Sequence, residues 1–182
     1  NFIEDAGYQV IYGDTDSVFV LLGSVPDDQV NVIGEGLTTQ LNAWWTNRLR
    51  EKYDISSFLE LEFETHFSKF LMPTVRGSNA GSKKRYAGLV VDSSNPKKSH
   101  LLFKGLESVR SDWSPLAREF QKELYRRVFF GEPYEDYIKL TVQQLTDGKY
   151  ESELVLRKRL RRKLKDYVKN VPPHAQAARK AE

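Results

Sequence analysis

The feature that most constrains the fold is residues 10–20, which read VIYGDTDSVFV. Two apolar runs flank a short polar tip in which Gly13 precedes Asp14, and this pattern predicts a β-hairpin with carboxylates at its turn. Asp14 and Asp16 are two residues apart. Extended residues with that spacing share one face of a strand, so the two carboxylates can converge. Two like charges held together are stabilised by a cation between them, and oxygen ligands suit a divalent metal.

An ordinary turn is the alternative for this tip, because Asp residues commonly cap their own backbone in turns. The apolar flanks favour the metal site, since a surface turn seldom needs strands as apolar as Val-Ile-Tyr and Val-Phe-Val-Leu-Leu. We therefore expect a hairpin packed inside a sheet, and both interpretations of its tip stay open on these residues alone.

Acidic and basic residues are segregated along the chain. Residues 1–64 hold twelve Asp or Glu and three Lys or Arg, a net charge of −9. The rest of the chain holds thirteen acids and twenty-five bases, a net charge of +12. This segregation predicts a metal-binding pole and a polyanion-binding pole, and ordinary solvated surface explains it less well.

Cysteine is absent, so disulfides and thiolate metal ligands are excluded, which suits a cytoplasmic protein. No apolar run approaches the roughly 18 residues that span a bilayer, and no signal peptide is recognisable, so we expect no membrane partner. The chain begins at Asn1 with what reads as the end of a helix, stopped at Gly7. We therefore expect it to be a piece of a longer protein.

The first part of the chain is predicted to combine strands with one long helix. Asp27 or Asp28 is placed to cap a helix that runs to about residue 52. Gly34 and Gly36 each weaken that helix by about 1 kcal/mol relative to Ala. Residues 59–64 alternate between apolar and acidic side chains and so predict a strand with three carboxylates on one face. Further strands are expected within residues 67–75, 83–91 and 101–105.

From residue 113 onward the pattern becomes helical. Ser114 as a cap and Pro115 at the first position start a helix that Gly131 ends, and Pro133 opens another. A third helical segment, 149–169, holds nine bases and three acids. A short closing helix is expected at 175–181. The predicted fold class is α+β, with an antiparallel sheet and a covering helix, then a mostly helical part, divided near residue 112.

Two basic stretches suggest a nucleic-acid ligand. The first is Lys-Lys-Arg-Tyr at residues 83–86, where cations suit phosphates and Lys or Tyr tips can reach a groove. The second is RKRLRRKLK at residues 157–165, which we call the arginine-rich segment. A zinc site is not expected, because the three histidines are scattered over different elements: His66, His100 and His174.

Several stretches, in order, resemble motifs of the family B DNA polymerases. Residues 12–17, YGDTDS, resemble the third palm motif of that family, and residues 83–89, KKRYAGL, resemble its basic Lys-Lys-x-Tyr motif. Residues 104–110, KGLESVR, resemble the segment that leads from palm to thumb. Residues 157–162 and 170–174 are similar to the thumb of bacterial members.

The resemblance covers the whole chain and implies its organisation. Residues 1–112 would be the C-terminal part of the palm, with an antiparallel palm-type sheet, and residues 113–182 would be part of a helical thumb. The implied function is that of a DNA-directed DNA polymerase, which transfers deoxynucleotides to a primer 3′ end by a two-metal mechanism.

The resemblance also implies a role for each matching residue near the hairpin. Asp16 matches the carboxylate that contacts the catalytic metal, and Asp14 matches the one that bridges two metals. Glu64 resembles an additional palm carboxylate, and Tyr12 and Thr15 fall at nucleotide-binding positions. The implied cofactor is Mg²⁺, with two ions in the complete enzyme.

The implied DNA contacts come from bases in both parts of the chain. Contacts in the minor groove are nearly the same for all correct pairs, so they test geometry without reading sequence. Ser111 departs from the family pattern, because many relatives carry a second Arg there. The residues expected to bind primer–template DNA are Lys83, Lys84, Arg85, Tyr86, Lys104, Arg110, Arg157, Arg159, Arg161 and Arg162.

Large parts of the family pattern are absent, including another palm Asp, the fingers motif with its triphosphate-binding Lys, and the exonuclease. We therefore expect this chain alone to be inactive and to bind Mg²⁺ weakly or not at all. Deoxynucleoside triphosphate would be a partner of the parent enzyme, and a sliding clamp would bind through the missing regions. The expected location is the bacterial cytoplasm, in association with the nucleoid.

Two other functions are compatible with parts of this pattern. A non-catalytic, sequence-independent duplex-binding module would explain the bases, and it predicts binding that weakens with salt. A glycosyltransferase also uses an Asp-x-Asp metal motif, but it gives no account of the basic strand or the arginine-rich segment.

Overall fold

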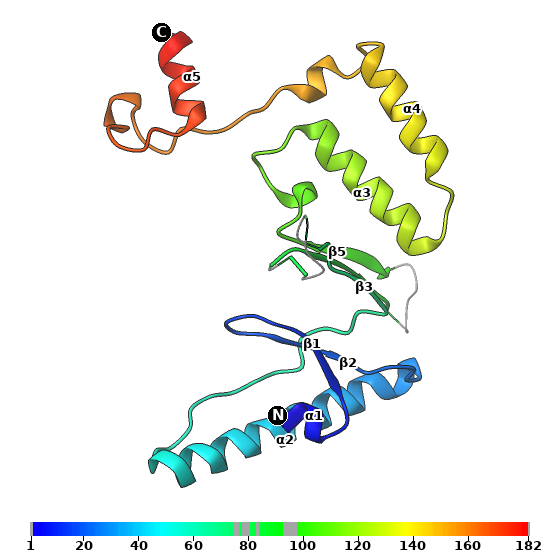
Figure 1. Ribbon diagram of the computed structural model, residues 1–182, viewed down its shortest axis with the longest axis vertical. Helices are drawn as coiled ribbons and strands as arrows, with labels where there is room; N and C mark the ends of the chain where they lie inside the picture. The colour runs from blue at the N-terminus through cyan, green and yellow to red at the C-terminus, as the bar shows by residue number, and fades with distance from the viewer. Residues whose placement is uncertain (1, 75–76, 78–80, 83, 93–97, 182) are drawn as a thin grey trace. The chain divides into compact units, whose positions relative to one another are not determined.

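The computed structural model describes residues 2–74, 77, 81–82, 84–92 and 98–181 (Figure 1). The chain divides into two compact units, Asn1–Leu102 and Phe103–Glu182, which we describe in turn. The predicted α+β class is confirmed. The strands form two small sheets, β1-β2 and β3-β4-β5, whereas the sequence suggested a single sheet.

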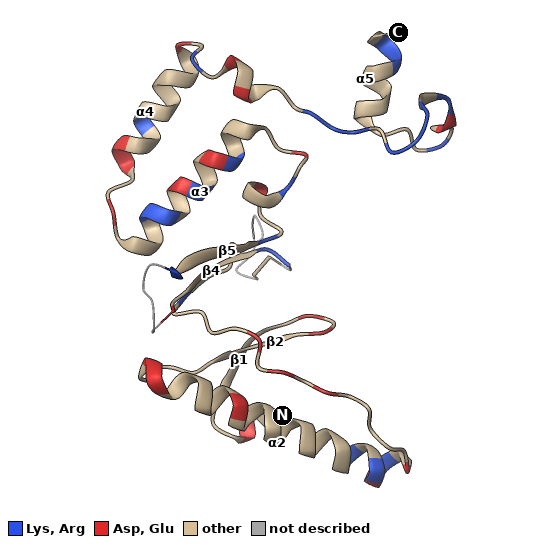
Figure 2. Cartoon of the chain, turned by 180° about the vertical axis from the view of Figure 1, so that it is seen from behind, with Lys and Arg blue, Asp and Glu red and all other residues tan. Residues whose placement is uncertain are grey.

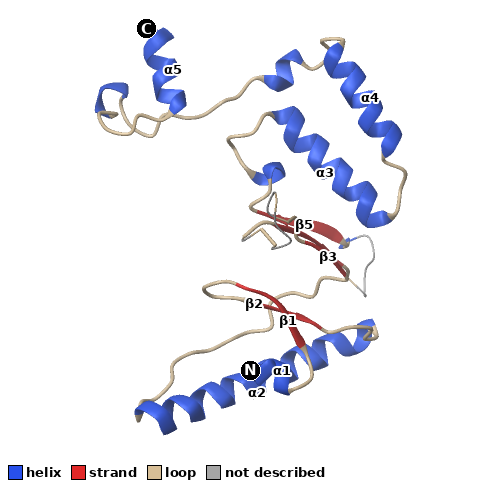
Figure 3. Ribbon diagram, in the orientation of Figure 1, coloured by secondary structure: helices blue, strands red, loops and turns tan. Residues whose placement is uncertain are grey.

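The first unit holds most of the strands and the longest helix (Figure 3). Its elements are α1 (Phe2–Asp5), β1 (Gln9–Gly13), β2 (Val18–Leu21), α2 (Asp27–Tyr53), β3 (Lys69–Leu71), β4 (Tyr86–Val90) and β5 (His100–Lys104), whose last two residues belong to the second unit.

The predicted hairpin is present. β1 and β2 are antiparallel, with Tyr12 opposite Phe19 and Gly13 opposite Val18. Residues 14–17 connect the strands, and we call them the hairpin turn. Their ends are closed by a hydrogen bond from the Asp14 N–H to the Ser17 carbonyl at 2.8 Å.

Helix α2 differs from its prediction at its start. Pro26 stands at the N-cap position without a side-chain hydrogen bond, so the expected capping by Asp27 or Asp28 is wrong. Both acids lie in the first turn instead, where their charges interact favourably with the helix dipole. Gly34 is buried, and a Cβ there would lie 2.6 Å from a ring carbon of Phe63. This glycine therefore permits close packing, which its low helix propensity alone did not reveal.

The strand predicted at residues 59–64 is not formed, because residues 54–67 have neither helix nor strand. The side chain of Asn42 takes the place of a neighbouring strand. Its Oδ1 accepts from the Leu61 N–H at 2.8 Å, and its Nδ2 donates to the Leu61 carbonyl at 2.9 Å. Alternation reports which side chains share a face, but a strand also needs a paired backbone.

Five aromatic rings connect the hairpin to the second sheet. Phe19 lies at the centre, with its ring centroid 5.5 Å from Tyr12, 5.3 Å from Phe70 and 5.1 Å from Tyr86. Phe67 completes the cluster, and a methyl group at Gly88 would overlap its ring. Aromatic pairs at these distances add to burial, so the cluster fixes the hairpin against β3 and β4.

The second unit is mainly helical. It contains the helices η2 (Glu107–Val109), α3 (Pro115–Phe130), α4 (Glu135–Thr146), η3 (Glu151–Leu154), η4 (Leu164–Asp166) and α5 (Pro173–Ala181).

Both ends of α3 are as predicted. The Ser114 Oγ accepts from the Ala117 N–H at 3.3 Å, Pro115 is the first helical residue, and Gly131 ends the helix with φ 70°. The rings of Phe120 and Tyr137 stack at 5.5 Å and join α3 to α4. In the parts of the chain that the structure describes, no helix has both the length and the apolar character needed to cross a membrane.

The helix expected within residues 149–169 is wrong. Residues 155–163 have neither helix nor strand, so most of the arginine-rich segment lies outside any helix. Seven of its nine residues are cationic and repel one another, and Leu160 and Leu164 are its only apolar residues. One apolar pair provides too little packing to stabilise a short helix.

Candidate active site

The hairpin turn places its two aspartates in different surroundings. Asp14 is half-buried and Asp16 is exposed, and both lie between the strands, so the argument from one strand face does not apply. Asp14 Oδ1 accepts hydrogen bonds from the Thr15 N–H at 2.8 Å and from the Thr15 hydroxyl at 3.4 Å. The turn chemistry foreseen as an alternative is therefore present, and it uses one oxygen of Asp14.

Lys84 approaches the other oxygen of Asp14. Its Nζ lies 3.4 Å from Asp14 Oδ2, and its backbone N–H donates to the Tyr12 hydroxyl at 2.9 Å. The hydrogen bond from the Thr15 N–H is the main cause that lowers the pKa of Asp14, and the charge of Lys84 lowers it further. Hydrogen bonds and a nearby cation both favour the charged carboxylate.

Tyr86 is half-buried, and its pKa is raised. Burial is the main cause, and interactions with Glu64, Tyr12 and Asp14 raise the pKa further. The carboxylates of Glu64 and Asp14 thus both raise the pKa of Tyr86, although they are 50 residues apart in sequence. Figure 2 shows acidic residues both at the tip of the hairpin and along the segment after α2.

The donor chemistry of this group fits Mg²⁺. Asp14 and Asp16 supply hard oxygen ligands, and Mg²⁺ is often held by one or two carboxylates while it keeps several waters. Among the described residues, no group of three or more His, Asp or Glu is arranged to hold a metal.

The predicted DNA-binding residues of the first unit differ in their exposure to solvent. Lys84 is exposed, whereas Arg85 and Tyr86 are half-buried, and Tyr86 belongs to the aromatic cluster. Lys83 lies outside the described residues.

The predicted DNA-binding residues of the second unit are mostly exposed, among them Lys104, Arg157, Arg159, Arg161 and Arg162. Arg110 is already bound within the chain: its Nε lies 3.0 Å and its Nη2 2.6 Å from the oxygens of Asp112. These hydrogen bonds lower the pKa of Asp112 to about 2. The guanidinium of Arg162 lies 4.7 Å from the centroid of the buried Tyr167 ring.

Two positioning contacts were missed from the sequence. One is the Tyr12 hydroxyl on Lys84, and the other is Gln121 on α3. Gln121 accepts from the Ser108 N–H at 2.7 Å and donates to the Glu107 carboxylate at 2.8 Å, so it holds the turn that precedes Arg110. Neither contact has a local signal, because the partners are 72 and 13 residues apart.

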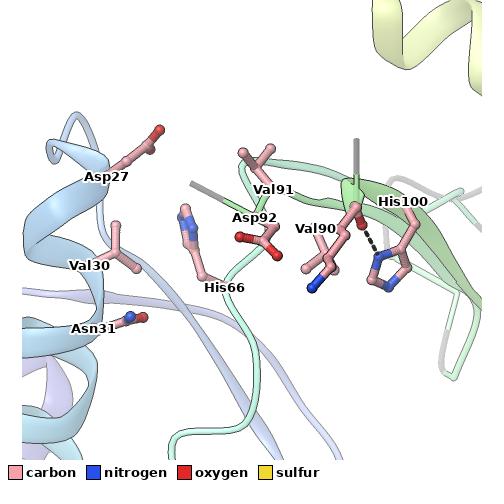
Figure 4. Close-up of a pocket in the computed structure, with 9 residues that line it drawn as sticks. Asp27, Val30, Asn31, His66, Val90, Val91, Asp92 and His100 are labelled. Carbon is pink, nitrogen blue, oxygen red and sulfur yellow. Dashed lines mark hydrogen bonds between the residues drawn. The ribbon is translucent and has the colours of Figure 1, made fainter. Parts of the chain in front are cut away.

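A separate pocket with a volume of about 720 Å³ opens in the first unit. In the view of Figure 4, His66 lies between the start of α2 and Asp92. Two of the three histidines, His66 and His100, line this pocket. Its full lining is Asp27, Val30, Asn31, His66, Val90, Val91, Asp92, Lys98 and His100.

The chain belongs to DNA polymerase family B, because the model of that family matches residues 1–182. It is similar to DNA polymerase II of Escherichia coli (strain K12), with 53% identity over 181 residues, 99% of this chain and 23% of the relative. A DNA polymerase of Archaeoglobus fulgidus is 29% identical over 182 residues, 98% of this chain and 19% of the relative. One of Thermococcus gorgonarius is 28% identical, over 97% of this chain and 20% of the relative. The chain spans less than a quarter of the length of each of these three relatives.

Proposed function

We propose that this chain is part of a DNA-directed DNA polymerase, a nucleotidyltransferase that extends a primer 3′ end in DNA replication or repair. Family membership supports the class of reaction. The observation that carries the proposal within the structure is the approach of Lys84 to Asp14, since it joins the carboxylate turn to the basic residues that precede β4. In this proposal residues 1–112 belong to the palm and residues 113–182 to the thumb.

The carboxylates of the hairpin turn would hold the cofactor. Asp14 and Asp16 would bind Mg²⁺, with Glu64 close by. When bound, two such ions lower the pKa of the primer hydroxyl and stabilise the charge that develops on the triphosphate. The Thr15 N–H fixes one oxygen of Asp14 and leaves Oδ2 directed at a cation. Tyr12 and Thr15 would border the incoming deoxynucleoside triphosphate.

The basic residues would bind primer–template DNA by its backbone. Lys84, with Lys83, Arg85 and Tyr86, would hold the duplex near the primer end, and Lys104 with Arg110 would continue the contacts. The exposed arginines 157, 159, 161 and 162 would add phosphate contacts that carry no sequence information.

Further partners and the location follow from the parent enzyme that we propose. A sliding clamp would bind through regions outside this chain, and the enzyme would act in the bacterial cytoplasm, in association with the nucleoid. The chain alone would be inactive and would bind Mg²⁺ weakly, because the further metal-binding Asp and the triphosphate-binding Lys of the family pattern are absent from it.

A non-catalytic duplex-binding module is the second candidate, and the exposed arginine-rich segment favours it for the isolated chain. The two candidates predict different effects of neutralising Asp14. Loss of this negative charge should impair a polymerase, whereas it should leave DNA binding by an architectural module unchanged or improve it. The glycosyltransferase alternative has no support from the family to which the chain belongs.

The test uses the longer polymerase that would contain this chain. Asp14→Asn is expected to lower template-directed nucleotide incorporation at least about a hundredfold, because charge stabilisation at the reacting phosphate is lost. Asp27→Asn, which makes the same change in the separate pocket, is the matched control and should retain activity. Full activity of the Asp14→Asn enzyme would overturn the proposal.

A further inference from the structure

Lys84 lies just before β4 and is held by two contacts with the hairpin. Its backbone N–H donates to the Tyr12 hydroxyl at 2.9 Å, and its ammonium lies 3.4 Å from Asp14 Oδ2. Its φ of 60° is in the left-handed region, which a side chain such as Lys seldom adopts. Unfavourable backbone geometry persists where surrounding contacts enforce it, and here the Tyr12 hydroxyl supplies such a contact.

The two oxygens of Asp14 have different partners. Oδ1 receives the Thr15 N–H, and Oδ2 faces the Lys84 ammonium. A cation that binds Asp14 through Oδ2 must therefore compete with Lys84. The side chain of Lys84 is 69% exposed and that of Asp14 22% exposed, so the ion pair is reached by water and is weak enough to be exchanged.

We propose that Lys84 is an internal counter-ion of Asp14 that a divalent cation displaces, and that Tyr12 is the positioning residue that holds it there. This inference rests on the proposed function. The ammonium has two alternative anions, the Asp14 carboxylate and a phosphate of the duplex. A divalent ion on Asp14 frees Lys84 for the phosphate, and a phosphate on Lys84 frees Asp14 for the ion.

Metal and duplex therefore raise each other's affinity by the same factor, as linkage requires. Tyr12 affects the size of that factor although it is uncharged. Its hydroxyl fixes the backbone of Lys84 and thereby keeps the Lys84 ammonium near Asp14. The ring of Tyr12 packs on Phe19, so Tyr12→Phe keeps the aromatic cluster and removes the one hydrogen bond.

The first experiment measures Mn²⁺ binding to this chain by electron paramagnetic resonance. Mn²⁺ takes the same oxygen ligands as Mg²⁺ and its free form is observed directly. Lys84→Met should lower the Mn²⁺ dissociation constant about two- to fivefold, the range expected for release of an exposed ion pair, and Tyr12→Phe should lower it less. Lys98→Met removes one positive charge at the separate pocket and is the matched control, with a smaller effect.

Asp14→Asn distinguishes failure of this inference from failure of the proposed function. If Asp14→Asn does not weaken Mn²⁺ binding, the metal role of Asp14 is wrong and the counter-ion role falls with it. If Asp14→Asn weakens binding but Lys84→Met acts no more strongly than Lys98→Met, only the counter-ion role is overturned. In the Asp14→Asn background, the Lys84→Met effect should shrink to that of Lys98→Met.

The second experiment repeats the Mn²⁺ titration with a short DNA duplex at constant ionic strength, corrected for Mn²⁺ on the duplex alone. The duplex should lower the dissociation constant about two- to fivefold in the wild-type chain and in Lys98→Met. Lys84→Met should abolish this coupling, Tyr12→Phe should reduce it, and Lys84→Arg should restore it. Equal coupling in the wild type and Lys84→Met would overturn the proposal, and circular dichroism verifies that each variant is folded.

Discussion

The hairpin turn and the arginine-rich segment both carry charged residues of the proposed function, but the structure holds these charges differently. In the hairpin turn, Asp14 has partners from Thr15 and from Lys84, which is 70 residues away. In the arginine-rich segment the four arginines are exposed, and the contacts of Arg161 and Arg162 go to the nearby Tyr167. A site that must place an ion needs long-range contacts, whereas a surface that binds phosphates by charge alone needs only exposure.

The largest effect on duplex affinity should follow from removing the exposed positive charges of the arginine-rich segment. Replacing arginines 157, 159, 161 and 162 by Gln should weaken duplex binding by this chain on the order of a thousandfold at 0.1 M salt. Each phosphate contact releases counterions from the DNA, and this favourable release is lost with the contact. Fluorescence anisotropy over a salt series should show the slope of log K against log salt falling by about three to four units.

The matched control for that variant replaces four other bases of the second unit by Gln: Lys122, Lys139, Lys149 and Lys180. They make the same change in net charge at residues outside the arginine-rich segment. An equal loss of affinity in both variants would mean that only net charge matters, and that the segment has no special part in binding.

The next effect tests the packing of the unit that carries the hairpin turn. Gly34→Ala should lower the free energy of unfolding by about 1–3 kcal/mol, because the new methyl group meets Phe63. Gly36 lies two residues away with nothing within 4 Å of its Cβ position, so Gly36→Ala should raise that free energy by up to about 1 kcal/mol. Urea unfolding of both variants measures the difference, and a stabilised Gly34→Ala chain would contradict the packing.

Arg110 combines properties of the two regions. It is a predicted DNA contact, like the exposed arginines, but it is already paired within the chain, with Asp112. Asp112→Asn should raise duplex affinity about threefold, since a weak surface ion pair no longer competes with phosphate. Asp147→Asn makes the same charge change elsewhere in the unit and is the control for anisotropy measurements. If both variants bind equally well, Asp112 does not compete for Arg110.

The smallest effect concerns Glu123 on α3. Hydrogen bonds from Arg126, then from Arg127, lower its pKa from 4.5 to about 2. A carboxyl group with a lowered pKa stabilises the folded state above its unfolded pKa, and this contribution is lost as the pH falls through the folded pKa. The stability difference between the wild type and Glu123→Gln should therefore shrink between pH 5 and pH 2. Thermal unfolding measures it, and a stability difference that stays constant over this pH range would contradict the prediction.

Local chemistry could be predicted from the sequence. The ends of α3 were predicted correctly because Ser114, Pro115 and Gly131 act within one turn of their own position. The hairpin was predicted correctly because its strands pair across four connecting residues. The family resemblance was confirmed over the whole chain.

Contacts between distant residues could not be predicted. The strand expected at residues 59–64 is absent, because the Asn42 side chain and not a neighbouring strand pairs with the backbone of Leu61. No sequence pattern predicts such a pair. The position of Lys84 beside Asp14 depends on the Tyr12 hydroxyl and on the fold of two sheets. The role of each candidate residue in metal and DNA binding stays a prediction.

The irregular backbone of the arginine-rich segment has a practical consequence for handling the protein. Trypsin cleaves after Lys and Arg and needs an exposed stretch that is free of helix and strand. Residues 157–163 offer six such bonds in seven residues between η3 and η4. Brief digestion should therefore cut here before it cuts the helices. Bound DNA that covers these bonds should delay the cut, so a timed digest reports where the duplex lies.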